Sequence, residues 1–228
     1  MLVLGIDTAT KIASVGLVRD GDALDEESCL AKSNHTETLL PLIVRLLARS
    51  QVSLSEVHGI GVSIGPGSFT GLRIALSAVK GFAYALGQQV VAVPTLEALA
   101  HTVSDWQGNI CPLLDARKGE VYAAHFRRQS HGSLERLTSD YVCTPQAFLE
   151  HLTTPCLFLG DALERYGDLI VERCGPAARL LPFSTHHPRG TAVAQLAWER
   201  LCRGECDDVS TLVPSYVRKP EAEFKRAN

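Results

Sequence analysis

The sequence contains no membrane-spanning hydrophobic run, no leader pattern and no paired cysteine motif. The longest apolar stretch, residues 71–87, is interrupted by Arg73 and Lys80 and falls short of the ~18 uninterrupted apolar residues that a bilayer span needs. The first residues lack a basic stretch and reach an acid at Asp7, unlike a secretory signal. Seven scattered cysteines without a Cys-x-x-Cys pair are typical of reduced thiols. We therefore expect a soluble, cytoplasmic protein without membrane association.

An excess of charge of one sign is also missing. Lys and Arg number 22 against 25 Asp and Glu, which gives a formal net charge of -3. Residues 1–100 carry 7 bases and 9 acids, and residues 101–228 carry 15 and 16. A protein that binds nucleic acid unaided usually has a basic surplus, so this class is disfavoured. If RNA is involved, we expect another subunit to supply most of the contact.

Apolar residues are abundant enough for an ordinary globular core. They make up 46% of the 228 residues, and a chain of this length buries roughly 70% of its unfolded surface without needing disulfides or metal. Their spacing predicts strands at 2–6, 12–18 and 23–30, a helix at 36–49, a strand at 57–64, a helix at 70–86, a strand at 90–93 and a helix at 95–102. This order is typical of ribonuclease-H-like and actin-like domains.

The rest of the chain predicts a second, smaller α/β region. Polar residues at 104–109 indicate a boundary. Strands at 110–114 and 121–126 follow, and a last helix is expected at 192–202. We expect an N-terminal half over 1–103, a smaller half over 104–190, and a terminal helix and tail over 191–228 that pack back on the assembly. The predicted fold class is α/β, with mixed central sheets flanked by helices.

A glycine-rich loop, residues 65–73, follows a predicted strand and opens a predicted helix. Backbone N–H groups at such a position favour anions. The loop nevertheless departs from the P-loop motif, because Leu72 stands in place of lysine, and from the dinucleotide motif, because Thr70 replaces the last glycine. Two interpretations stay open: an anion cradle, or a structural turn in which Ser68 or Thr70 caps the helix.

A second candidate is the turn Asp7-Thr8-Ala9-Thr10 between the first two strands. Actin-like phosphotransferases place an acid and small hydroxylated residues here to hold a nucleotide phosphate and its magnesium, although glycine is usual where Ala9 stands. Asp7 could instead cap its own turn. The candidate phosphate contacts from both segments are Asp7, Thr8, Thr10, Gly65, Gly67, Ser68 and Arg73.

Two other motifs have simpler interpretations. Residues 61–65 match G-x-S-x-G, but Ser63 lies inside a predicted strand rather than on the sharp turn that a hydrolase nucleophile needs. Residues 114–122 read as an exposed hairpin with Gly119 in its turn. The histidines and cysteines show no spacing typical of a metal site.

Taken in order, several blocks of this sequence resemble the TsaB (YeaZ) family. They are residues 6–10, 35–41, 65–73, 80–81, 114–122 and 214–218. Small departures occur at Ala9, where serine is common, and at Ala75, where glycine is common. The resemblance implies an actin-like (ASKHA) fold of two ribonuclease-H-like halves. It also implies a role in forming N6-threonylcarbamoyladenosine at position 37 of tRNAs that read codons beginning with A.

The resemblance further implies partners. In this pathway TsaD, a paralogue, transfers the threonylcarbamoyl group from threonylcarbamoyl-AMP, TsaB is the partner that TsaD needs, and the ATPase TsaE joins them. TsaD-like proteins hold a metal through an H-x-x-x-H segment, and the matching stretch here has Thr95 and Leu99 at the ligand positions. Neither side chain replaces imidazole. We therefore expect no metal and no required cofactor in this chain, no catalysis by it alone, ATP or ADP only within the complex, and only indirect contact with tRNA.

Two predicted helices are apolar around more of their circumference than one buried face needs, namely 36–49 and 71–87. Such helices are buried on two sides. Either both are sandwiched in their own domain, or their outer faces form an interface shared by a homodimer and a heterodimer with TsaD. The predicted interface residues are Leu39, Leu42, Ile43, Leu46, Leu72, Leu76, Val79, Lys80, Ala83 and Tyr84.

An enzyme is the alternative to a non-catalytic partner. One candidate is a stand-alone, nucleotide-dependent phosphotransferase of the actin-like superfamily, and the other is a glycoprotease-like metalloprotease. The missing turn glycine counts against the phosphotransferase, and the missing histidine pair counts against the protease.

Overall fold

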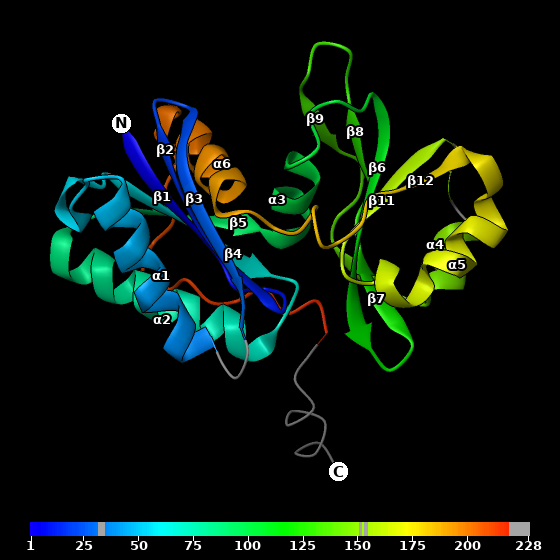
Figure 1. The fold of residues 1–228 in the computed structure, drawn as a ribbon, viewed down its shortest axis with the longest axis horizontal. Helices are drawn as coiled ribbons and strands as arrows, with labels where there is room; N and C mark the ends of the chain where they lie inside the picture. The colour runs from blue at the N-terminus through cyan, green and yellow to red at the C-terminus, as the bar shows by residue number, and fades with distance from the viewer. Residues whose placement is uncertain (32–34, 151, 153–154, 219–228) are drawn as a thin grey trace.

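The computed structural model describes residues 1–31, 35–150, 152 and 155–218, which form two β-sheets with helices packed on them (Figure 1). The first sheet has the strand order β3-β2-β1-β4-β5. The second has the order β10-β7-β6-β11-β12, with β8 pairing with β6 and β9. Both sheets mix parallel and antiparallel pairs.

The first sheet and its helices are built mainly from the N-terminal residues. Their bounds are β1 Leu2–Asp7, β2 Ile12–Arg19, β3 Asp22–Leu30, α1 His35–Arg49, the short helix η1 Leu54–Glu56, β4 Gly59–Gly65, α2 Phe69–Leu86, β5 Gln89–Pro94 and α3 Thr95–His101. Every strand and helix predicted for this region is confirmed within a few residues. The β2–β3 turn has positive φ at Asp20 and Gly21, which suits the twist of a tight hairpin.

The second sheet follows. Its elements are β6 Gly108–Arg117, β7 Glu120–Ala123, β8 Phe126–Arg128, β9 Leu134–Arg136, β10 Tyr141–Cys143, α4 Pro145–Glu150, β11 Cys156–Leu159, α5 Leu163–Cys174, η2 Gly175–Ala177 and β12 Ala178–Leu180. The single strand predicted at 121–126 was wrong. It is two strands, because β7 pairs with the end of β6 while β8 pairs with its beginning.

The last helix, α6 (Gly190–Cys202), returns to the first sheet and covers one of its faces. Val3 and Val18 contact the α6 side, whereas Leu4 and Ile6 pack toward α1 and α2 on the other face. This alternation along β1 is the period of two expected of a strand buried on both faces. None of the helices in the described part of the chain is long and apolar enough to span a bilayer.

Glycines let α6 approach the sheet closely. A Cβ atom on Gly5 would lie 2.0 Å from the carbonyl oxygen of Gly190, and one on Gly16 would lie 2.2 Å from the backbone nitrogen of Thr191. The helix and the strands are therefore in backbone contact, and no side chain larger than hydrogen fits at these positions.

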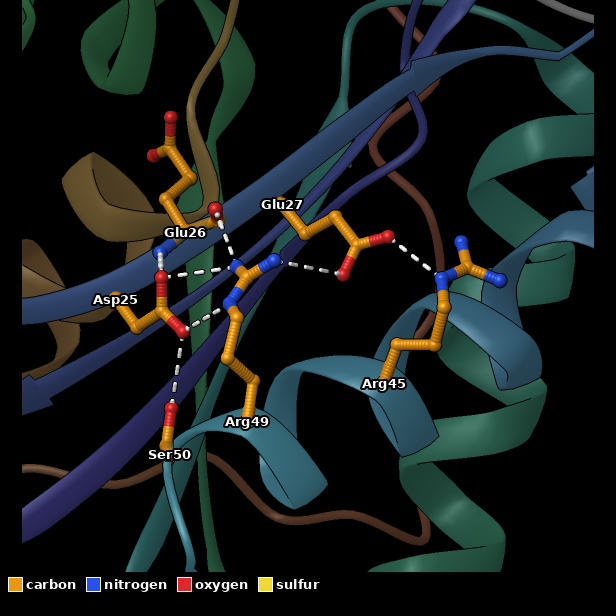
Figure 2. A network of polar contacts seen from close by, with 6 residues as sticks. All are labelled: Asp25, Glu26, Glu27, Arg45, Arg49 and Ser50. Atoms are coloured by element: carbon orange, nitrogen blue, oxygen red, sulfur yellow. Dashed lines mark hydrogen bonds and ion pairs between the residues drawn. The ribbon is translucent and has the colours of Figure 1, made fainter.

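Ion pairs tie α1 to the edge strand β3 (Figure 2). Arg49 donates from Nε and Nη2 to the carboxylate of Asp25 at 2.7 and 2.9 Å, and Arg45 donates from Nε to Glu27 at 2.7 Å. The hydrogen bonds from Arg49 hold the pKa of the Asp25 carboxyl below its usual value. Exposed pairs of this kind contribute little individually, so they supplement the core packing of α1.

We predict that Gly5→Ala lowers the free energy of unfolding by about 1–3 kcal/mol, because the added methyl group meets backbone atoms that cannot move independently. The matched control is Gly81→Ala, on the exposed side of α2 where an added Cβ meets nothing within 4 Å. That variant should gain about 0.5–1 kcal/mol from helix propensity. Urea denaturation of both variants measures the difference, and equal stabilities would contradict the close-packing argument.

Candidate functional site

The β1–β2 turn and the glycine loop, predicted to flank a phosphate, lie directly against each other. The backbone N–H of Ser68 donates to the carbonyl of Ala9 at 2.7 Å, and Thr8 Oγ1 donates to the carbonyl of Gly71 at 2.8 Å. A Cβ on Gly67 would lie 2.4 Å from the Ala9 oxygen, and one on Gly71 would lie 2.0 Å from the Thr8 oxygen. The chain's own backbone fills the space between the two segments, so these residues do not fit a nucleotide phosphate there.

Ser68 caps α2. Its Oγ accepts a hydrogen bond from the Gly71 N–H at 3.2 Å, which satisfies one of the free N–H groups of the first helical turn. Of the two interpretations of the loop, the structural turn is the one that the geometry favours. A nucleotide contact at Thr10 or in this loop stays a prediction.

Asp7 is completely buried beneath the turn. Its Oδ1 accepts the Ala9 N–H at 3.0 Å, while Oδ2 has no hydrogen-bond partner among the described residues. Burial raises the pKa of Asp7 to about 6, an effect partly offset by the neighbouring Ser63 hydroxyl and by the Ala9 N–H. The carboxyl group therefore accepts a hydrogen bond within its own turn and does not reach the surface.

A cleft of about 730 Å³ lies between the two sheets. The first half lines it with Thr10, Lys11, His35 and residues 67–70, and the second half lines it with residues 114–117, Tyr122, Asp161 and Glu164.

The charged groups of the cleft are engaged in ion pairs or in hydrogen bonds to the backbone. Lys11 Nζ bridges to both carboxylate oxygens of Glu164 at 2.7 Å, which ties the two halves together. Asp161 accepts the Asp115 N–H at 2.9 Å, and Asp115 accepts the Arg117 N–H at 2.8 Å. Burial raises the pKa of Asp161. Three acids against two bases make a poor binding surface for phosphate groups.

The positions matched to metal ligands carry structural side chains. Thr95 is buried and its Oγ1 accepts the Gly65 N–H at 3.1 Å, while Leu99 packs in the core of the second half. Within the described residues, no three His, Cys, Asp or Glu side chains gather as a metal-binding group.

The residues of the predicted partner interface differ in how accessible they are. Because α1 and α2 turn these faces toward the first sheet, eight of the ten residues lie in the chain's own core: Leu39, Leu42, Ile43, Leu46, Leu72, Leu76, Val79 and Ala83. Lys80 is half-buried, with Nζ 3.4 Å from the Ser210 carbonyl. Tyr84 is 69% exposed. Of the predicted set, Tyr84 is thus the residue whose side chain is freely accessible.

Other apolar residues of the same helices do reach the surface, among them Leu40 at 50% and Val44 at 65% exposure. A groove of about 570 Å³ runs between α1 and α2, lined by Thr36, Leu39, Leu40, Phe69, Thr70, Arg73, Ile74, Ser77 and Ala78. The sequence prediction missed Leu40 and Phe69. The sequence did hold a usable signal, because both are apolar residues that lie outside the stripe of core positions on their helix.

Arg73, predicted to contact phosphate, lies at this groove instead. Its guanidinium carbon stands 3.7 Å from the ring centre of Phe69, and Nε donates to the Tyr216 hydroxyl at 2.8 Å. Gly65, with φ of +120°, contacts Ser215, whose N–H donates to the Ile64 carbonyl at 2.7 Å. The end of the described chain therefore lies along the glycine loop.

Comparison with known proteins finds consistent relatives. Residues 29–226 match the family model described as "TsaD: tRNA N6-adenosine threonylcarbamoyltransferase". The tRNA threonylcarbamoyladenosine biosynthesis protein TsaB of Bacillus subtilis is 32% identical over 228 residues, covering 99% of this chain and 97% of the relative. The structure of YeaZ from Pseudomonas aeruginosa matches with a TM-score of 0.78 and 31% identity, over 94% of this chain and 99% of that one.

A more distant structural neighbour shares the fold of this chain but has little sequence identity with it. The ROK hexokinase of Thermus thermophilus aligns with a TM-score of 0.51 at 12% identity, over 90% of this chain and the whole of that one. With the two mixed sheets, this confirms the predicted actin-like fold.

We predict that Asp7→Asn stabilises the protein increasingly as the pH rises from about 4 to 6. The folded-state pKa of about 6 lies above the ordinary value of 3.8, so the folded state binds the proton more tightly and the wild type loses stability as Asp7 ionises. Below pH 4 the two proteins should differ little. Above pH 6 the advantage of the variant should level off on the order of 3 kcal/mol.

Urea denaturation from pH 4 to 8 measures this difference. The control is Asp22→Asn, which removes an exposed carboxylate on β3. A pH-independent difference for Asp7→Asn would contradict the burial argument.

Proposed function

This chain belongs to the TsaB family of tRNA threonylcarbamoyladenosine biosynthesis proteins, and we propose that it serves there as the non-catalytic partner of a TsaD-type transferase. It takes part in forming N6-threonylcarbamoyladenosine on tRNA. We propose that it does so by binding and activating the transferase through the groove between α1 and α2.

The observation that supports this proposal is the groove itself. It is an accessible, largely apolar depression on two helices whose other faces are already buried in the core. Exposed apolar surface beyond scattered single residues is a feature of protein interfaces. Val44 on α1 and Tyr84 on α2 are further exposed apolar side chains of the same two helices.

The enzymatic alternatives have less support. A phosphotransferase needs room for phosphate between the β1–β2 turn and the glycine loop, and backbone contacts at Gly67 and Gly71 occupy that space. A metalloprotease needs metal ligands, and Thr95 and Leu99 are engaged in a hydrogen bond and in core packing.

The same groove is proposed to serve a homodimer when the transferase is absent. TsaE would join through the complex, tRNA would be held mainly by other subunits, and any ATP or ADP would bind only within the assembly. A cytoplasmic location is part of the proposal and is supported by the seven cysteines, all of them free thiols.

Reconstitution tests the proposed function. Threonylcarbamoyl-AMP and tRNA are incubated with TsaD and TsaE, with and without this chain, and with this chain alone. We expect modified adenosine only when TsaD and this chain are both present. Modification by this chain without TsaD, or full modification by TsaD without this chain, would overturn the proposal.

We predict that Leu40→Glu reduces this modification at least tenfold and prevents co-elution with TsaD, because a carboxylate in the apolar groove loses its hydration on docking. Leu40 is half exposed, so the monomer should remain folded. The matched control is Val171→Glu on α5, which is similarly exposed at 51% but belongs to the other half. Equal losses in both variants would argue against the groove as the interface.

A further inference from the structure

The segment Pro214–Arg218 links the groove between α1 and α2 to the cleft between the sheets. After α6 the chain crosses back beneath the first sheet, where Leu212 packs against its core. Ser215 then hydrogen-bonds to the end of β4. Figure 1 shows this red segment leaving the first half and pointing toward the second.

Tyr216 is the contact at the groove. Its ring stacks on Phe69 with 5.0 Å between the ring centres, and its hydroxyl accepts the hydrogen bond from Arg73. Phe69 and Arg73 both line the groove. Phe69 and Thr70 also line the cleft, so the start of α2 forms the wall between the two depressions.

Arg218 is the contact at the cleft. Its Nη1 donates to the Ala116 carbonyl at 2.8 Å, and its guanidinium pairs with Glu120. Both partners belong to the β6–β7 hairpin, whose residues 114–117 line the cleft. Only Val217 separates Tyr216 from Arg218, and a two-residue step spans at most about 7 Å. Tyr216 and Arg218 are therefore so close along the chain that restricting one side chain restricts the other.

We propose that Pro214–Arg218 is a strap that couples the groove to the cleft, so that a partner docked in the groove steadies the β6–β7 hairpin over the cleft. Docking against Phe69 and Arg73 restricts Tyr216, and Arg218 passes this restriction to Ala116 and Glu120. The coupling is reciprocal. When the strap holds the hairpin, Phe69 is also held in the position that it has when a partner is docked. The identity of the docked partner rests on the proposed function, whereas the strap itself does not.

Hydrogen exchange on the full-length chain tests the strap. The readout is the exchange rate of the amides of residues 115–120, two of which are protected by hydrogen bonds to Asp161 and Asp115. We expect Arg218→Ala to speed this exchange about tenfold. Tyr216→Ala should have an effect of the same direction although Tyr216 does not touch the hairpin. The control is Arg203→Ala, which loses only an exposed pair with Glu205, and its exchange should match wild type.

Unchanged hairpin exchange in Tyr216→Ala or Arg218→Ala would overturn the strap. A urea titration shows whether each variant is folded. If Tyr216→Ala fails to fold, Tyr216→Phe, which removes only the hydroxyl that accepts from Arg73, replaces it and must still speed the exchange.

Adding TsaD tests the coupling. Binding should slow hairpin exchange in wild type, and Arg218→Ala should lose this slowing while still co-eluting with TsaD. Equal slowing in both proteins would overturn the coupling. Failure of TsaD to bind the wild-type chain would instead overturn the proposed function and the coupling that rests on it. The strap would then be tested by the hydrogen exchange of the isolated chain.

Discussion

Contact between backbones at glycine positions is the constraint on which the rest of this structure depends. Gly5 and Gly16 let α6 lie directly on β1 and β2, and Gly67 and Gly71 let the start of α2 lie directly on the β1–β2 turn. A methyl group at any of them would overlap backbone atoms, which cannot rotate away as a side chain can. These contacts place Phe69 at the boundary between the groove and the cleft.

The same contacts decide what chemistry the fold can perform. The actin-like frame retains its cleft, but the space that would receive a phosphate between turn and loop holds the chain's own carbonyls. The charged side chains of the cleft are engaged in ion pairs or in hydrogen bonds to the backbone, as in the bridge from Lys11 to Glu164. The groove on the outer helices is, by contrast, apolar and accessible. This contrast supports the proposal that the chain binds another protein through the groove.

Some features of the fold could be predicted from the sequence, and others could not. The strands of the first sheet were predictable because alternation in β1 and β2 is a local signal. The break between β7 and β8 was not, because it arises from pairing with two different parts of β6. The apolar circumference of α1 predicted burial on two sides, but the structure buries one face and leaves Leu40 and Val44 exposed. Leu42 and Leu46 could not be assigned to core or surface until the position of the sheet was known.

The sequence by itself determined the order of elements in the N-terminal half, the fold class and the family, since each follows from local patterns or from motifs read in order. Only the tertiary structure decided which apolar faces are internal, how the glycine loop packs against the β1–β2 turn, and what Tyr216 and Arg218 contact. These properties depend on residues far apart in the chain. Tyr216 meets Arg73 across 143 positions, and Arg218 meets Ala116 across 102. No local pattern encodes such contacts, because they form only when the two halves and the end of the chain pack together.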